Sequence, residues 1–313
     1  MSKHWTSLDG MRGSLAMLVV LGHFGLAGFA TRHFGLWKLQ LGLAVDVFFI
    51  LSGFVLTHGA RAPLSIRRFA IKRCFRLLPV YYVTTLIVVV AAGLPPQPWA
   101  ELLVAGPFTG REPANFPAWS ICWELYLPVL AVALAGLLPQ VRLPQWLVRS
   151  LLVVGLLTLG VIDIGVARGE QSYLARAVVG LASGHLLYRS GWTIARGYDV
   201  LALAVVGVII VAGGMPVLAL GLPGMAAAAV VAGRRSDGLF TTRPMHWLGA
   251  VSYTIYLAHI PVLRVMQALF GGLIDHNAPA KLAGVAVTLV LADLLSRLVE
   301  RPAMRLGARL TRH

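Results

Sequence analysis

The sequence predicts an all-α integral membrane protein, with about ten transmembrane helices around a central polar pore and both termini in the cytoplasm. The chain has 313 residues, of which 58% are hydrophobic and only 12% are charged. Soluble domains carry about twice that share of charge, and the mean hydropathy of this chain is +0.78. Apolar runs of about 20 residues, the length that crosses a bilayer as a helix, recur along the whole sequence.

The apolar runs are separated by connections rich in proline and glycine, such as "GLPPQPW" after the third run and "GGMP" after the seventh. No small-residue cleavage site follows the first run, so we expect it to be a span and not a signal peptide. We expect one transmembrane domain over residues 1–313, because no soluble segment and no repeat of fixed period interrupts the pattern. The expected spans are 11–30, 39–60, 77–93, 119–138, 146–166, 172–188, 198–213, 215–232, 245–270 and 280–299.

The basic residues predict the orientation of these spans. With the N-terminus inside, twenty of the 27 lysines and arginines fall in cytoplasmic segments, and five fall on the opposite side. The remaining two, Arg176 and Arg264, lie within spans. This bias is typical of the positive-inside rule, so it places both termini in the cytoplasm and favours an even number of spans.

The net charge of +15 has the same origin. A soluble protein of this charge would suggest a nucleic-acid partner, but no soluble domain is present to bind one, so we expect none. The two cysteines, Cys74 and Cys122, form neither a disulfide framework nor a metal-ligand pattern. We therefore expect no metal.

Several ionisable residues are expected at one depth of the membrane. Arg12 lies at the inner end of the first span, and His23 lies three turns further out on the same helix face. Asp46 in the second span, Glu124 in the fourth and His259 in the ninth fall in the same outer half as His23. Ionisable groups within spans usually face one another or a cavity and take part in function.

Each of these residues also has a structural interpretation. A lone buried histidine is more often a packing residue, and Asp46 alone suits a hydrogen bond between helices. The coincidence of His23, Asp46 and Glu124 is what favours a site.

A second group of residues lies on the cytoplasmic side, in "RAPLSIRRFAIKRCFRLLPVYY". Six basic residues between Arg61 and Arg76 suit simple topogenic charge and attraction to anionic lipid. The alternative is a binding site for a phosphate-rich cytosolic ligand, because arginine forks bind phosphate well. Topogenic charge explains the number of basic residues but does not require the spacing Arg73-x-x-Arg76 next to the third span, so the pattern leaves both interpretations open.

Six short motifs occur in a fixed order along the chain. They are "RGSLAMLVVLGH" (Arg12 to His23), "VDVFFILSGFVL" (45–56), "RCFRLLPVYY" (from Arg73), "WSICWELYL" (119–127), "LGAVSYTIYLAHIPVL" (248–263) and a Glu-x-Pro ending at 300–302. Together they resemble the motifs of the membrane acyltransferase-3 family, bacterial integral-membrane enzymes with animal relatives that acylate sugars and other hydroxyl compounds. The chain differs in having Cys122 and Trp123 beside Glu124, and we expect no C-terminal hydrolase-like domain of the kind that some members carry.

The resemblance implies an O-acyltransferase of the bacterial inner membrane, with cytosolic acetyl-CoA or another acyl-CoA as donor. The acceptor would be a hydroxyl of an envelope glycan, an exopolysaccharide or a lipid-linked sugar, and the other partners would be membrane lipids. His23 would act as general base, with Asp46 or Glu124 holding its tautomer. The donor would bind Arg12, Lys72, Arg73 and Arg76, and the acceptor would bind Trp119, Ser120, Tyr253 and His259.

Other classes of function remain open on the sequence. The same buried His23, Asp46 and Glu124 would suit the proton relay of a secondary transporter, which should also show inverted repeats. No convincing repeat is present, and the cytoplasmic arginines have no role in that interpretation. A silent membrane scaffold would tolerate the loss of His23. Within the enzyme interpretation, direct transfer and an acyl-histidine intermediate are both compatible with the residues.

Overall fold

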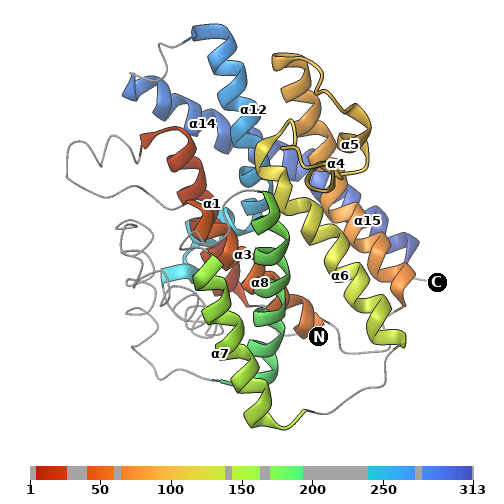
Figure 1. Ribbon diagram of the computed structural model, residues 1–313. Helices are drawn as coiled ribbons and strands as arrows, with labels where there is room; N and C mark the ends of the chain where they lie inside the picture. The colour runs from red at the N-terminus through yellow and green to blue at the C-terminus, as the bar shows by residue number, and fades with distance from the viewer. Residues whose placement is uncertain are drawn as a thin grey trace. The chain divides into compact units, whose positions relative to one another are not determined.

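The computed structural model describes residues 5–26, 41–59, 65–137, 143–162, 170–192, 239–271 and 277–311 (Figure 1). These residues form helices joined by turns, without a strand among them, so the all-α prediction is confirmed for this part of the chain. The expected spans 198–213 and 215–232 lie outside the described residues.

The helices divide into two units that do not follow one another along the chain. Unit 1 contains Met1–Leu18, Ala27–Pro63 and Pro139–Ala250, and unit 2 contains Val19–Leu26, Leu64–Leu138 and Val251–His313. Helix α1 (Thr6–His23) therefore contributes its first part to unit 1 and its last turn to unit 2.

Unit 1 is organised around the pairing of α3 (Leu41–Gly59) with α8 (Glu170–Ser190), and α7 (Gln145–Val161) packs on α8 (Figure 1). Gly180 and Gly184 form a small-xxx-small pair on α8. A Cβ atom at Gly184 would collide with the backbone of α3 at Ile50. Glycines at this spacing let the two backbones approach closely, as they do in membrane helix pairs.

The first part of α1 packs in the same unit on α11 (Arg243–Ala250), which follows the short helix η4 (Leu239–Thr241). Gly13 lies against the backbone of Leu248 and Gly249.

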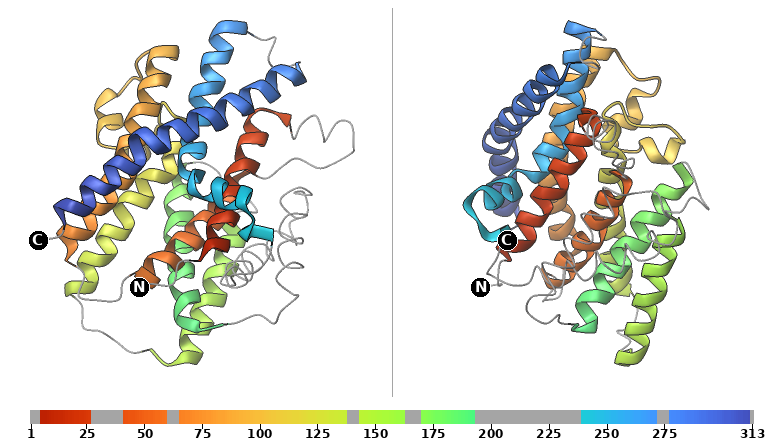
Figure 2. Two further views of the ribbon diagram at one scale, coloured as in Figure 1. Left: turned by 180° about the vertical axis from the view of Figure 1, so that it is seen from behind. Right: turned by 90° about the vertical axis from the view of Figure 1, so that its left-hand side faces the viewer.

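Unit 2 is built around α12 (Ser252–Phe270), which packs against both α4 (Ile66–Ala92) and α14 (Ala278–Leu295) (Figure 2). Helix α6 (Trp119–Leu137) lies beside α4. After α14 the helix continues through the π-helical turn η5 (Ser296–Glu300) into α15 (Arg301–Leu310), which packs back on α4.

Three helical segments in the described part of the chain are long and apolar enough to cross a membrane: Ile66–Ala92, Phe116–Ala135 and Ala278–Leu310. A fourth is present if α11 and α12, which are separated at Val251, together form one broken span. The chain therefore has the character of a membrane protein. The count of ten spans and the orientation of the termini stay predictions.

Helix α1 ends earlier than the expected span 11–30. Gly25 adopts a left-handed conformation with φ 68°, and its N–H donates to the carbonyl of Gly22. A glycine in this conformation is a common helix terminator, because it lacks the Cβ atom that disfavours positive φ. His23 consequently lies in the last turn of its helix.

The connection between α4 and α6 is not a simple loop. It contains α5 (Pro98–Leu102), η1 (Gly106–Thr109) and η2 (Phe116–Ala118) and folds back along α4. The Tyr81 hydroxyl, deep in α4, donates to the Glu101 carboxylate at 2.8 Å, and the other Glu101 oxygen accepts from the N–H of Ala114 at 2.7 Å. The Tyr81 bond holds residues 98–118, which we call the folded-back segment, against α4, and the Ala114 bond closes the segment on itself.

Candidate active site

Two histidines meet in unit 2. Nδ1 of His23, in the last turn of α1, lies 3.2 Å from Nε2 of His259 in α12, and the ring centroids are 5.0 Å apart. His259 is fully buried, whereas His23 is partly exposed. The sequence placed both residues at one depth, and the structure brings them into direct contact.

The neighbours of His23 determine which of its nitrogens carries a proton. Nδ1 lies 3.0 Å from the carbonyl oxygen of Val19. A carbonyl oxygen only accepts hydrogen bonds, so the proton is on Nδ1, and Nε2 of His259 serves as its second acceptor. A neutral imidazole with a proton on Nδ1 has its lone pair on Nε2. The tautomer of His23 is therefore the one in which Nε2 can accept a proton.

The folded-back segment forms a wall beside this histidine pair. The ring of Phe116 meets the ring of His23 edge-on, with centroids 6.2 Å apart. The Tyr256 hydroxyl donates to the carbonyl of Pro117 at 3.0 Å and lies 3.2 Å from the Ser120 hydroxyl. Ser120, predicted to bind the acceptor, is therefore close to the segment that contacts His23. Tyr256 belongs to the same group of residues, although the sequence analysis did not single it out.

A second group of residues surrounds Arg73, which is buried in α4. Its Nε donates to the backbone carbonyl of Glu124 at 2.8 Å, and its terminal nitrogen lies 3.3 Å from the Glu124 carboxylate. The carbonyl of Glu124 is available because Pro128, four residues later in α6, has no N–H to bond to it. Arg73 thus holds both the backbone and the side chain of Glu124.

This pairing differs from the depth expected for Glu124. Phe116 contacts His23, and Glu124 lies eight residues beyond Phe116, which is roughly 12 Å of helical rise. The difference arises because the folded-back segment starts α6 part-way down α4, whereas the sequence interpretation started this span at the membrane surface. Glu124 consequently lies near Arg73.

Asp46, the remaining carboxylate predicted for the site, is bound in unit 1. Its two oxygens accept from Nε and from a terminal nitrogen of Arg176 at 2.9 and 2.8 Å. Both residues are more than nine-tenths buried. This bidentate pair continues the face of α8 that carries Gly180 and Gly184, so it matches the helix-to-helix interpretation of Asp46.

Three other predicted residues, Tyr253, Trp119 and Lys72, belong to unit 2. Tyr253 donates to the carbonyl of Leu77 at 2.6 Å and lies within electrostatic reach of Arg73 and Arg76. Trp119 is buried at the start of α6, and Lys72 is exposed on α4.

Arg12 belongs to unit 1, where it forms an i,i+3 ion pair with Asp9 at 3.5 Å. Of the four predicted donor-binding residues, Arg12 thus belongs to unit 1, whereas Lys72, Arg73 and Arg76 belong to unit 2. Within the described residues, no three histidine, cysteine or acidic side chains converge as metal ligands would.

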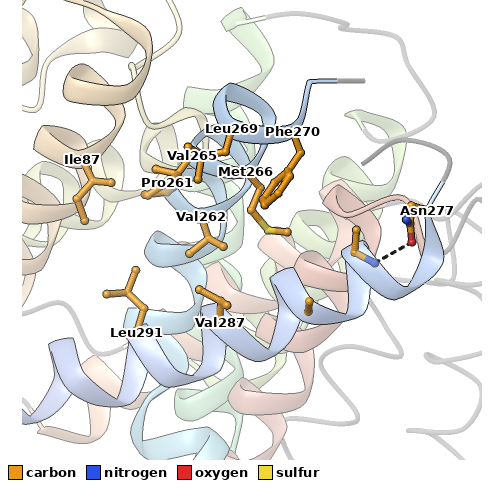
Figure 3. Close-up of a pocket in the computed structure, with 12 residues that line it drawn as sticks. Ile87, Pro261, Val262, Val265, Met266, Leu269, Phe270, Asn277, Val287 and Leu291 are labelled. Carbon is orange, nitrogen blue, oxygen red and sulfur yellow. Dashed lines mark hydrogen bonds between the residues drawn. The ribbon is translucent and has the colours of Figure 1, made fainter. Parts of the chain in front are cut away.

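An apolar pocket of about 650 Å³ opens between α4, α12 and α14 (Figure 3). Its wall on α12 begins at Pro261, two residues beyond His259. The polar member of its lining, Asn277, caps α14 by accepting from the N–H of Ala280 at 3.1 Å. The pocket has the volume of a ligand site but carries no titratable group, so it suits a hydrocarbon group and not the reaction itself.

The family model described as an acyltransferase domain matches residues 5–297. Acyltransferase MdmB of Streptomyces mycarofaciens is 28% identical, over 97% of this chain and 92% of the relative. BcsY of Komagataeibacter xylinus, whose name describes a membrane-bound transacylase, is 26% identical over 95% of this chain and 82% of its own length.

A shorter match covers 28% of this chain and 14% of the peptidoglycan O-acetyltransferase OatA of Listeria monocytogenes, at 29% identity. No solved structure matches the chain significantly. Because the family model extends over nearly the whole sequence, the protein belongs to the acyltransferase-3 family and is an acyltransferase.

Proposed function

We propose that the protein transfers an acyl group, most simply acetyl, from cytosolic acyl-CoA to a hydroxyl of a cell-envelope glycan or a lipid-linked sugar. The observation that carries this proposal is the tautomer of His23, in which the contacts of Nδ1 leave the lone pair on Nε2. An alcohol becomes a good nucleophile when a base removes its proton, and a neutral imidazole is a competent base near neutral pH.

In the proposed reaction, Nε2 of His23 takes the proton of the acceptor hydroxyl while its oxygen attacks the carbonyl carbon of the thioester. The C–S bond then breaks, and the CoA thiolate takes the proton back from His23. The products are the ester and the free thiol, and the histidine returns to its starting state. His259 accepts from Nδ1–H throughout, so it orients the ring and stabilises the imidazolium, as the carboxylate does in a Ser-His-Asp triad.

The donor would approach from the group around Arg73. Arg73 and Arg76 carry positive charge suited to the phosphates of CoA, and both lie near Tyr253 at the start of α12. His259 lies six residues further along the same helix, which is roughly 9 Å. The flexible pantetheine arm of the donor would span the distance from the arginines to the histidine pair.

The acceptor class follows from a different observation. Tyr256 and Ser120 place two hydroxyls beside the carbonyl of Pro117, in the segment that contacts His23. A polar wall of this kind next to a general base suits a polyhydroxylated acceptor. The relative OatA is named as a peptidoglycan O-acetyltransferase, which supports a glycan acceptor for this chain.

The proposal is tested with the full-length protein in lipid nanodiscs, supplied with acetyl-CoA and envelope glycans of the native host. The readouts are thiol release and ester formation on the glycan by mass spectrometry. Replacing His23 with Ala should lower turnover by about 10²- to 10⁴-fold. The matched control is His185→Ala, because His185 is a helix histidine that bonds to Thr57 in unit 1. Undiminished turnover in His23→Ala, or solute flux without ester formation in the wild type, would contradict the proposal.

A further inference from the structure

Asn115 is a completely buried side chain that the proposed chemistry does not use. It immediately precedes η2 in the folded-back segment. Its Nδ2 donates to the backbone carbonyl of Leu257 in α12 at 3.0 Å and to the Thr84 hydroxyl in α4 at 3.2 Å. One amide group therefore joins three parts of unit 2 that lie far apart in the sequence.

The Leu257 carbonyl accepts this bond because of a proline in its own helix. In an α-helix the carbonyl of residue 257 would bond to the N–H of residue 261. Residue 261 is Pro261, which has no N–H, so the carbonyl has no partner within the helix. An unpaired buried carbonyl is costly. Asn115 supplies the missing donor from outside the helix.

The bond lies between the two sides of the histidine site. On the loop side, Phe116 follows Asn115 directly and contacts the His23 ring. On the helix side, Leu257 lies two residues before His259. The Asn115 bond therefore fixes where the wall that touches His23 lies relative to the helix that carries His259.

We propose that Asn115 is a positioning residue of the transferase, which holds Phe116 and α12 in the register that the His23–His259 pair requires. This inference rests on the proposed function. A purely structural alternative is that Asn115 only satisfies the Leu257 carbonyl. The two roles separate in a double variant, because Pro261→Ala gives that carbonyl a helical N–H and leaves the loop without its tie.

The experiment compares Asn115→Ala, Pro261→Ala and the double variant with the wild type, as full-length proteins in nanodiscs. The thermal unfolding midpoint is measured, together with kcat and KM for thiol release from acetyl-CoA with envelope glycans present. Thr288→Val is the matched control, since Thr288 is also fully buried in unit 2 but bonds only within α14, to the carbonyl of Gly284.

Asn115→Ala should lower both the midpoint and kcat, with kcat reduced about 100-fold by misplacement of the reacting groups and KM for acetyl-CoA nearly unchanged. The double variant should recover the midpoint but not kcat. Recovery of kcat together with the midpoint would overturn the positioning role, and so would an undiminished kcat in Asn115→Ala.

A second readout separates this inference from the proposed function. Diethyl pyrocarbonate reacts with unprotonated histidine nitrogens in a reaction called carbethoxylation. Mass spectrometry measures the rate of this reaction at His23. The rate should change in Asn115→Ala and stay changed in the double variant. A wild-type protein that transfers no acyl group would contradict the proposed function, whereas an unchanged carbethoxylation rate at His23 in both variants would contradict the role of Asn115.

Discussion

His23 has one proton on Nδ1 and two acceptors for it, the carbonyl of Val19 and Nε2 of His259. The Val19 contact lies within one helix turn and depends only on the backbone. The His259 contact depends on a side chain that is fully buried. The orientation of the reactive nitrogen is thus determined by α1 itself and by one residue of α12.

Replacing His259 tests this division at the level of a single residue. His259→Ala removes the second acceptor and should lower kcat by about 10²-fold or more, with KM for acetyl-CoA nearly unchanged. His259→Gln offers a side-chain oxygen as acceptor, so it should retain more activity than His259→Ala. Steady-state kinetics on both variants make the comparison, with His246→Ala, an exposed histidine of α11, as control. Equal losses in the two His259 variants would show that acceptor chemistry at this position does not matter.

Arg73 has two roles in the proposal: it holds Glu124 in the fold, and it binds the phosphates of the donor. A lysine at this position keeps the charge, but its single nitrogen does not reproduce the two contacts that separate guanidinium nitrogens make with the Glu124 carbonyl and carboxylate. Arg73→Lys should therefore lower the thermal midpoint and also weaken acetyl-CoA binding. Calorimetry on both properties checks this expectation, with Arg68→Lys, exposed on the same helix, as control. Unchanged acetyl-CoA affinity in Arg73→Lys would leave this arginine with a structural role alone.

At the scale of the helices, two prolines explain side-chain contacts between helices that the sequence did not predict. Pro128 and Pro261 both lie inside apolar runs that were correctly interpreted as helical. Each removes an N–H, and the carbonyl four residues earlier then bonds to a side chain from another element, Arg73 or Asn115. The freed carbonyls were predictable from the sequence. Their partners were not, because those lie 51 and 142 residues away along the chain.

The pairing of α3 with α8 gives a prediction for a whole element. Gly184 lies against the backbone of α3, so Gly184→Leu should force the helices apart and lower the thermal midpoint strongly, with the Asp46–Arg176 pair disturbed nearby. Ala182→Leu makes a similar increase in size on the exposed side of α8 and should have little effect. Thermal unfolding of both variants in nanodiscs checks this. Similar midpoints for the two variants would argue against close packing at Gly184.

At the scale of the whole molecule, hydropathy and charge predict the class of the protein well, but they do not predict which side chains meet. The apolar runs locate α3, α6, α7, α8 and α14 within a few residues, because burial in lipid leaves a strong signal. The pairing of Glu124 with Arg73 was not predicted, because the folded-back segment before α6 is held by Tyr81 and Glu101, a pair whose contact no local pattern encodes. The contact between His23 and His259 was foreseen only as a shared depth.

The orientation of the chain is tested by labelling. In a variant whose two native cysteines are replaced by serine, a membrane-impermeant maleimide should label Lys38→Cys on intact cells. Arg305→Cys should react only after permeabilisation, because the excess of basic residues places it inside. Gel-shift labelling of the two variants makes the comparison. Labelling of Arg305→Cys on intact cells would contradict a cytoplasmic C-terminus.

The apolar pocket between α4, α12 and α14 also bears on how the protein withstands extraction from its membrane. Residues of its rim such as Leu269 and Phe270 are exposed, as suits contact with hydrocarbon. In water the same surface would favour aggregation. We expect detergent tails to cover this surface after extraction, and a longer tail to cover more of it than a short one. The chain length of the solubilising agent is therefore expected to be a variable of stability.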